Sequence, residues 1–418
     1  MTKPLLGNKE SFLAFQHLNF RRFIFSKFML TLALQIQFVV LSWQVYEITH
    51  DPLSLGFIGL AEAIPAVGLA LYGGYISDRS DRRKILVWVQ GLMIVCTGIL
   101  TYLSYHYSSL PLSQQSAFPF YVIMFGIGIL RGFYSPAQFP LMTQVVPREA
   151  YANSSAWNST FWHIAVVLGS SGGGLMLGFF GKNTSYIVVL VCMLIGFLQI
   201  VRIPPQPIQE YKPGEKMMSN IREGLRFVFS NQAILGALTL DLIAVLFGGA
   251  TAMLPIFASD ILHVGEKGFG FLRAAPFAGS VIIALYMTRY PPLKNAGKRL
   301  LFCVAGFSVC MIAFALSRNF YLSLFILALS GAFDNVSVVI RSLIMQLMTP
   351  DHMRGRVSSV STMFISSSNE IGAFESGFAA KLLGLIPSVI IGGSIALTSV
   401  AAAGVALPEM RKLDLSKA

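Results

Sequence analysis

Charged residues are scarce in this sequence. They make up 12% of its 418 positions, whereas a typical soluble domain has about 25%. Hydrophobic residues account for 55% of the chain. This composition argues against a water-soluble protein and indicates an integral membrane protein.

Cysteine and histidine are also rare, and neither is spaced as in a metal site. The four cysteines fall in apolar segments, which favours small buried side chains over disulfides or ligands. The phosphate-binding motif G-x-x-x-x-G-K-[ST] is missing, so ATP-driven transport by this chain is not expected. No set of nucleophile, base and orienting residue can be assembled. The sequence therefore predicts neither an enzyme nor a bound cofactor.

Apolar runs long enough to cross a bilayer as helices recur along the whole chain. They predict an all-α membrane protein with about twelve spans. The predicted spans are Phe23–Ile48, Leu53–Ile76, Ile85–Tyr105, Phe118–Val145, Asn153–Phe180, Ser185–Val201, Ala233–Leu262, Gly268–Tyr290, Leu300–Leu316, Phe320–Met348, Val357–Leu383 and Pro387–Leu407.

Lysine and arginine are unevenly divided between the loops. If the N-terminus is cytoplasmic and the spans alternate, only Lys182, Lys267 and Arg318 fall on the opposite side. This is the positive-inside bias, and it predicts that both termini are cytoplasmic. Lys27 is counted here with the cytoplasmic positive charges. The net charge of +12 is thereby explained by the membrane, without nucleic acid as a partner.

The two halves of the chain are related by a shift of 203 positions. The shift pairs Gly128 with Gly331 and Pro147 with Pro350. An internal repeat of about six spans predicts two pseudo-symmetric six-helix bundles, residues 1–203 and 232–418.

A linker, residues 204–231, joins the predicted bundles. It contains a stretch with apolar residues on one helical face and Arg222 and Arg226 opposite, which predicts an amphipathic helix on the inner membrane surface. The alternative is a solvated linker with chance periodicity. The apolar residues are Ile221, Leu225, Val228 and Phe229.

Ionisable residues inside the spans are the main bottom-up indication of function. Because such residues are costly in a bilayer, they are expected to face the protein interior or a wet cavity. Every third span lacks them, which suggests an outer ring of helices and an inner set lining a solute pathway. The candidates for coupling or ion pairing are Glu62, Arg131, Asp241, Asp334, Arg341, Glu370 and Glu375. The cavity-lining candidates are Gln35, Gln37, Gln44, Gln138 and His163.

Asp334 has two possible partners. Arg341 lies seven residues further on and so shares its helix face, while Arg131 occupies the equivalent repeat position and could pair with Asp334 across the bundles. A static ion pair is the alternative to proton coupling for each candidate. His163 is more often a satisfied buried histidine than a proton relay.

The loop between the second and third spans carries the clearest motif. Gly74, Asp78, Arg79, Arg83 and Lys84 follow the pattern G-x-x-x-D-R-x-G-x-R-R/K, with an aspartate at position 81 in place of the second glycine. In this loop the chain resembles the major facilitator superfamily. The resemblance implies two six-helix bundles, alternating access, a monomer and a gating role for Asp78.

Three segments resemble the enterobactin exporter and macrolide efflux branch of that superfamily. The branch implies a transporter in the bacterial cytoplasmic membrane that exports an amphipathic small molecule, a drug or siderophore, and uses the proton gradient with no cofactor. The alternatives are proton-coupled uptake of a solute, or a transporter-fold sensor or lipid-handling protein. The segments are 78–84, 146–153 and 350–357.

Overall fold

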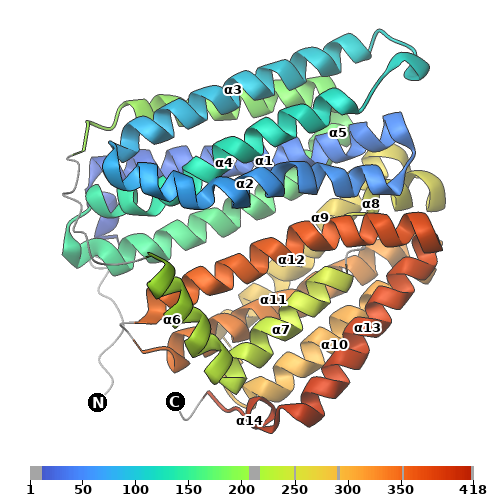
Figure 1. Ribbon diagram of the computed structural model, residues 1–418. Helices are drawn as coiled ribbons and strands as arrows, with labels where there is room; N and C mark the ends of the chain where they lie inside the picture. Colours follow the sequence, from blue (N-terminus) through green and yellow to red (C-terminus); the bar gives the residue numbers. More distant parts are fainter. Residues whose placement is uncertain (1–11, 207–216, 249–250, 290–291, 351–352, 416–418) are drawn as a thin grey trace. The chain divides into compact units, whose positions relative to one another are not determined.

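The computed structural model describes residues 12–206, 217–248, 251–289, 292–350 and 353–415 (Figure 1). Every regular element in these ranges is a helix. The long helices are α1 (Leu18–Thr49), α2 (Pro52–Arg79), α3 (Arg82–Tyr107), α4 (Phe118–Gln144), α5 (Tyr151–Val201), α6 (Met217–Ser230), α7 (Gln232–Phe247), α9 (Gly265–Arg289), α10 (Ala296–Leu316), α11 (Phe320–Met348), α12 (Arg354–Leu383) and α13 (Leu385–Ala406). The short helices are η1 (Ala14–Gln16), η2 (Leu112–Gln114), η3 (Arg148–Ala150), α8 (Leu254–Ile256), η5 (Phe257–Ile261) and α14 (Pro408–Arg411).

The chain divides into two compact units. Unit 1 consists of Met1–Thr49 and Ala61–Tyr211, and unit 2 consists of His50–Leu60 and Lys212–Ala418. The first residues of α2 therefore group with unit 2, although the rest of that helix belongs to unit 1.

Nine of the described helices are long and apolar enough to cross a membrane, or ten if the bent α6–α7 pair forms one span. The predicted all-helical membrane fold is confirmed, and every predicted span except the seventh falls on a described helix. Two of them share α5, whose helical geometry is interrupted at Gly181. The eleventh falls on α12, which is not among the nine and carries charged residues along its length.

The seventh predicted span is wrong as a continuous helix. The chain is helical from Gln232 to Phe247, and after a break it resumes in α8 and the π-helical turn η5. The sequence places glycines at 248 and 249 and Pro255 in this stretch. Glycine and proline are the residues that most disfavour a helix interior, which accounts for the break.

In unit 1, α1 packs along α5 through small residues on α5. A Cβ atom built on Gly169 would lie 2.6 Å from the Cβ of Gln35, and one on Gly173 would lie 2.9 Å from the Cα of Ile36. No side chain fits at these distances, so the two glycines allow the backbones to approach closely.

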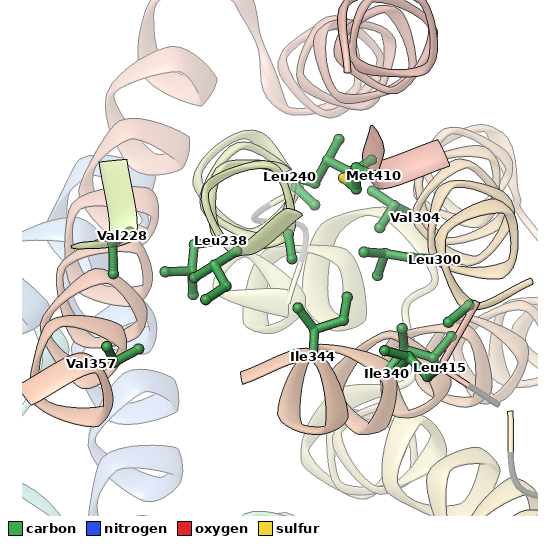
Figure 2. Packing of buried hydrophobic residues seen from close by; sticks show 14 of the residues in the cluster. Val228, Leu238, Leu240, Leu300, Val304, Ile340, Ile344, Val357, Met410 and Leu415 are labelled. Carbon is green, nitrogen blue, oxygen red and sulfur yellow. The ribbon is translucent and has the colours of Figure 1, made fainter. Parts of the chain in front are cut away.

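The core of unit 2 is formed by α7, α10, α11, α12 and the C-terminal segment (Figure 2). α6 lies in the predicted linker: Val228 is fully buried in this core, Leu225 packs against it, and Arg222 and Arg226 are exposed. Its place on the inner membrane surface stays a prediction. Phe229 is 60% exposed, however, so it does not share the buried face. The side chain of Ile221 lies outside the described residues.

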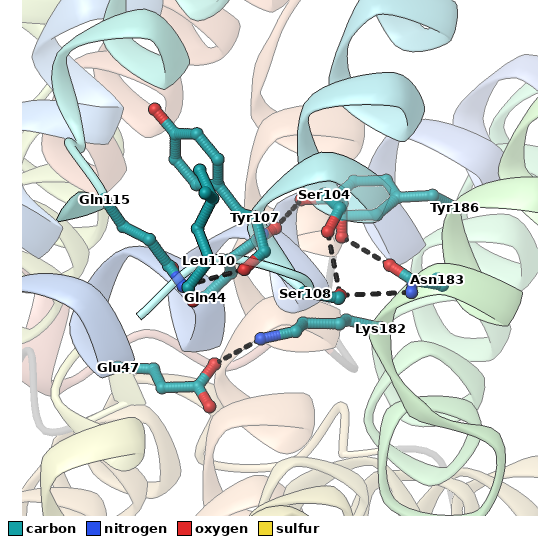
Figure 3. Close-up of polar contacts among 10 residues, drawn as sticks. All are labelled: Gln44, Glu47, Ser104, Tyr107, Ser108, Leu110, Gln115, Lys182, Asn183 and Tyr186. Carbon is teal, nitrogen blue, oxygen red and sulfur yellow. Dashed lines mark hydrogen bonds and ion pairs between the residues drawn. The ribbon is translucent and has the colours of Figure 1, made fainter. Parts of the chain in front are cut away.

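The second half of α5 is anchored to α1 and α3 directly after Gly181 (Figure 3). Lys182 Nζ lies 2.8 Å from Glu47 Oε2, and Asn183 Oδ1 accepts a hydrogen bond from Ser104 at 2.9 Å. One turn later Tyr186 donates to Gln44 at 3.0 Å. These contacts hold the chain where it reverses direction between the fifth and sixth predicted spans.

Gly181 has φ 76° and ψ 171°, a conformation that is essentially restricted to glycine. Gly181→Ala is expected to destabilise the purified protein by about 1–3 kcal/mol, seen as a lower thermal unfolding temperature in detergent. Gly98→Ala is the matched control. Gly98 lies in α3 with nothing within 4 Å of the added methyl group, so this change should be neutral or stabilising by about 0.5–1 kcal/mol. Equal unfolding temperatures for the two variants would contradict the assigned strain.

Candidate functional site

In unit 2, a buried ion pair joins α7 to α11. Arg341 Nη1 lies against Asp241 Oδ1, and both side chains are 9% exposed. The predicted Arg341–Asp334 pair is therefore wrong. The seven-residue spacing places both residues on one face of α11, but the carboxylate that reaches Arg341 comes from α7.

Asp334 lines a small pocket beside this pair. Asp241 and Ser337 lie in the same wall, with Cys303 and Phe307 from α10 closing it. Within the described residues, no cation lies within ion-pair distance of Asp334; Arg273 on α9 donates instead to the backbone oxygen of Thr251 at 3.2 Å. Among the described residues, the pocket thus has two carboxylates, of which Asp241 forms an ion pair with Arg341 and Asp334 forms none.

In unit 1, α2 and α4 are joined by an ion pair between Glu62 Oε1 and Arg131 Nη1. Glu62 is the more buried partner, with its side chain 8% exposed against 44% for Arg131. A Cβ on Gly128 would meet the backbone oxygen of Glu62 at 2.2 Å, so glycine is needed for the two helices to come this close. Arg131 is therefore paired within its own unit, and the predicted Arg131–Asp334 pair, which would join the two units, stays a prediction.

A second small pocket lies among α1, α4 and α5 of unit 1. Its lining residues are Phe23, Lys27, Gln138, Phe139, Met142 and Asn158. Lys27 Nζ donates to Asn158 Oδ1 at 2.7 Å. Gln138 was predicted to line a cavity and is found in this wall. From the sequence, Lys27 was counted with the cytoplasmic charges. It stands four residues inside the predicted first span, however, and this position could have marked it as an intramembrane cation.

The glutamines of α1 have different surroundings. Gln37 is 1% exposed and accepts from Thr97 Oγ1 at 2.7 Å, and Gln44 is fully buried against Tyr186. These two lie in helix contacts with α3 and α5, which corrects their prediction as cavity-lining residues. Gln35 is half-buried, and its amide oxygen accepts from Ser170 at 3.1 Å.

The remaining intramembrane candidates do not join either pocket. His163 is exposed on α5 with its ring 4.8 Å from that of Trp162, so it is not the buried histidine that was expected. Glu375 is half-buried on α12. The side chain of Glu370 lies outside the described residues.

The motif loop is a two-residue connection between α2 and α3. Asp81, which replaces the pattern's second glycine, caps α3 by accepting from the backbone N–H of Arg83 at 3.0 Å. The Arg83 side chain donates to the Val201 oxygen at the end of α5 at 2.6 Å, a favourable place for a cation.

The other motif residues are placed on either side of this connection. The Arg79 guanidinium stacks 4.1 Å from the ring centre of Tyr75, Gly74 is buried, and Lys84 is exposed. The side chain of Asp78 lies outside the described residues, so its gating role stays a prediction.

Residues 10–418 match the family described as transmembrane secretion effector. The chain belongs to this family. It is a multi-pass membrane transporter of the major facilitator superfamily, as the motif loop predicted.

Curated relatives agree with this assignment. The enterobactin exporter EntS of Escherichia coli O1:K1 / APEC is 24% identical over 384 residues, covering 90% of this chain and 89% of that protein. EntS of Shigella flexneri is 24% identical over 386 residues, covering 90% and 88%. The predicted resemblance to enterobactin exporters is confirmed.

Solved structures share the fold. The POT family transporter PepTSo has a TM-score of 0.69 at 11% identity, covering 95% of this chain and 99% of that one. A D-xylose-proton symporter has a TM-score of 0.65 at 14% identity, with coverages of 94% and 97%.

Asp241→Asn is expected to destabilise the transporter by about 3–5 kcal/mol, because it leaves the Arg341 charge buried without its partner. The loss should appear as a lower unfolding temperature and a smaller monodisperse fraction in detergent. Asp241→Asn combined with Arg341→Gln removes both charges and should recover most of that loss. If the double variant is as unstable as the single one, the ion pair is not the cause.

Proposed function

We propose that this transporter is a secondary-active, proton-coupled exporter of an amphipathic small molecule, working by alternating access. Export is supported by the curated relatives, which carry the name enterobactin exporter. Proton coupling is compatible with the fold, because a D-xylose-proton symporter shares it. We further propose a place in the bacterial inner membrane, which the relatives support, with both termini cytoplasmic, which the distribution of lysine and arginine favours, and a monomer with no cofactor.

The observation that carries the proposal is the imbalance of charge around Asp334. Two carboxylates, Asp334 and Asp241, line one pocket, and Asp241 is already paired with the guanidinium of Arg341. An uncompensated carboxylate is expensive once water is excluded from a membrane protein. Binding one proton at Asp334 removes the surplus negative charge. The pocket therefore favours a protonated Asp334 when closed and an ionised one when wet.

Coupling requires this difference in the protonation of Asp334 between the closed and the wet pocket. A group that takes a proton from one side and loses it on the other can drive a conformational cycle only if the two states bind the proton with different free energy. The proton affinity of Asp334 can differ between the two states, because its negative charge is balanced by solvent and not by a fixed cation. Glu62 and Asp241 lack it, because each already has an arginine partner within its own unit.

The first test of the proposal is transport itself. An efflux-deficient bacterium expressing the chain is loaded with a panel of drugs and catecholate siderophores, and retention is measured with and without a protonophore. Faster, protonophore-sensitive loss of at least one compound is expected. Faster accumulation would instead indicate uptake. Unchanged retention of every compound, with the protein present in the membrane, would contradict export and favour a sensor or lipid-handling role.

The second test concerns Asp334. Asp334→Asn keeps the shape of the side chain but cannot change charge, so protonophore-sensitive efflux should fall by about tenfold or more at normal protein level. Asp334→Glu should retain part of the activity. Glu47→Gln is the matched acid-to-amide control, since Glu47 belongs to unit 1, pairs with Lys182 and does not line this pocket. Equal losses for Asp334→Asn and Glu47→Gln would argue against Asp334 as the coupling group.

A further inference from the structure

Lys27 is a cation inside a membrane helix for which no acidic partner is found. Within the described residues, its polar contact is with the neutral oxygen of Asn158 at 2.7 Å, and no carboxylate lies within ion-pair distance. Glu47 and Glu62, the acids of unit 1 that lie within spans, are already paired with Lys182 and Arg131. The positive charge of Lys27 is therefore left for something outside the described chain to neutralise.

The internal repeat shows that this position is unusual. Gly169 and Gly372 are 203 positions apart, and Cβ atoms built on them would lie 3.4 Å from Leu32 Cα and 3.0 Å from Leu246 Cα. Leu32 and Leu246 are thus equivalent positions on α1 and α7. Lys27 precedes Leu32 by five residues, since 32 − 27 = 5.

The same spacing separates Asp241 from Leu246, since 246 − 241 = 5, so Lys27 occupies in unit 1 the place that Asp241 occupies in unit 2. Gln138 and Arg341 are likewise 203 positions apart. Unit 2 therefore has an acid and a base that neutralise each other, whereas unit 1 has a base facing an amide.

The pocket around Lys27 has the composition of a subsite for an amphipathic anion. Lys27 supplies the charge, and Gln138 Nε2 is a buried donor with no hydrogen-bond partner. Phe23, Phe139 and Met142 supply the apolar part of the wall. A charged and an uncharged N–H donor beside apolar side chains suit an oxygen anion carried on an apolar or aromatic body.

We infer that Lys27 and Gln138, with Asn158 holding the lysine in place, form an anion-binding subsite for a carboxylate or phenolate group of the transported molecule. The inference rests on the proposed function for its ligand and narrows the substrate class to amphipathic anions. When the anion binds, Lys27 donates to its oxygen and the positive charge within α1 is neutralised. The subsite thereby gives preference to anionic over cationic compounds of similar shape.

Binding is tested on the purified full-length protein in a neutral maltoside detergent. Benzoate, benzyl alcohol and benzylamine have the same aromatic ring with a negative, neutral or positive head, and each is titrated while thermal unfolding is followed. Benzoate should raise the unfolding temperature of the wild type more than the other two. Lys27→Met should weaken the apparent benzoate affinity by about tenfold or more, and Lys27→Arg should largely keep it.

Asn158→Asp separates an anion subsite from a merely structural lysine. The change places a carboxylate at the position of the Asn158 oxygen, 2.7 Å from Lys27 Nζ, and creates an internal ion pair. The variant should fold at least as well as the wild type and yet lose the benzoate effect, because its own carboxylate neutralises Lys27. A folded Asn158→Asp protein that still responds to benzoate like the wild type would overturn the inference.

Other outcomes also overturn it. They are an equal response to benzyl alcohol and benzoate, benzoate stabilisation that survives in Lys27→Met, and no benzoate effect in the wild type. A Lys27-dependent shift with added phosphatidylglycerol but none with benzoate would assign the pocket to a lipid headgroup instead. In the efflux assay, export that is unaffected by Lys27→Met for every anion would overturn the subsite and leave the proposed function intact. Benzoate binding without export of any compound would support the subsite and contradict the proposed function.

Discussion

A charge that a membrane helix carries into the hydrocarbon layer must be neutralised or hydrogen-bonded within the protein, because water is not there to do it. In this transporter that constraint links helices within each unit. Glu62 and Arg131 join α2 to α4, and Asp241 and Arg341 join α7 to α11. Breaking such a pair costs far more than forming it gains, so each pair fixes how its two helices can move. Ionisable residues outside these pairs are the ones that remain able to change their charge or their partner.

Glycine lets α2 approach α4 beside the Glu62–Arg131 pair, and a matching glycine lets α9 approach α11 in unit 2. At Gly128 the backbone oxygen of Glu62 occupies the space of a side chain, and at Gly331 the backbone oxygen of Pro276 does the same at 1.9 Å from a built Cβ. The repeat has therefore kept a close helix crossing at the same place in both units. A close crossing fixes the distance between the two helices, and a salt bridge in a low dielectric needs such well-defined geometry.

The sequence was sufficient for the membrane class and most of the spans, because composition and apolar run length decide these directly, and for the repeat, because residues match at a fixed shift. It was not sufficient for the ion pairs. Periodicity shows that two residues share a helix face, as Gln37 and Gln44 do, but not which neighbour that face meets. Those glutamines face α3 and α5 in place of a cavity. Lys27 was missed for another reason: it lies near the start of the predicted first span and was counted with the loop, although its position inside the span indicated the interior.

The two units carry surplus charges of opposite sign in their pockets, at positions that the repeat does not make equivalent, because Lys27 matches Asp241 and Asp334 matches Arg131. Unit 2 carries a surplus carboxylate at Asp334, and unit 1 carries a surplus ammonium at Lys27. On the proposed assignment, proton and anion bind to different residues and do not compete for the same atoms. Their coupling must then act through the conformational equilibrium, with each ligand favouring the state in which its own site is neutral. Such coupling is reciprocal, so a bound anion has to change proton affinity by the same factor as a bound proton changes anion affinity. A carrier built this way can change its substrate preference in unit 1 without losing its proton site in unit 2.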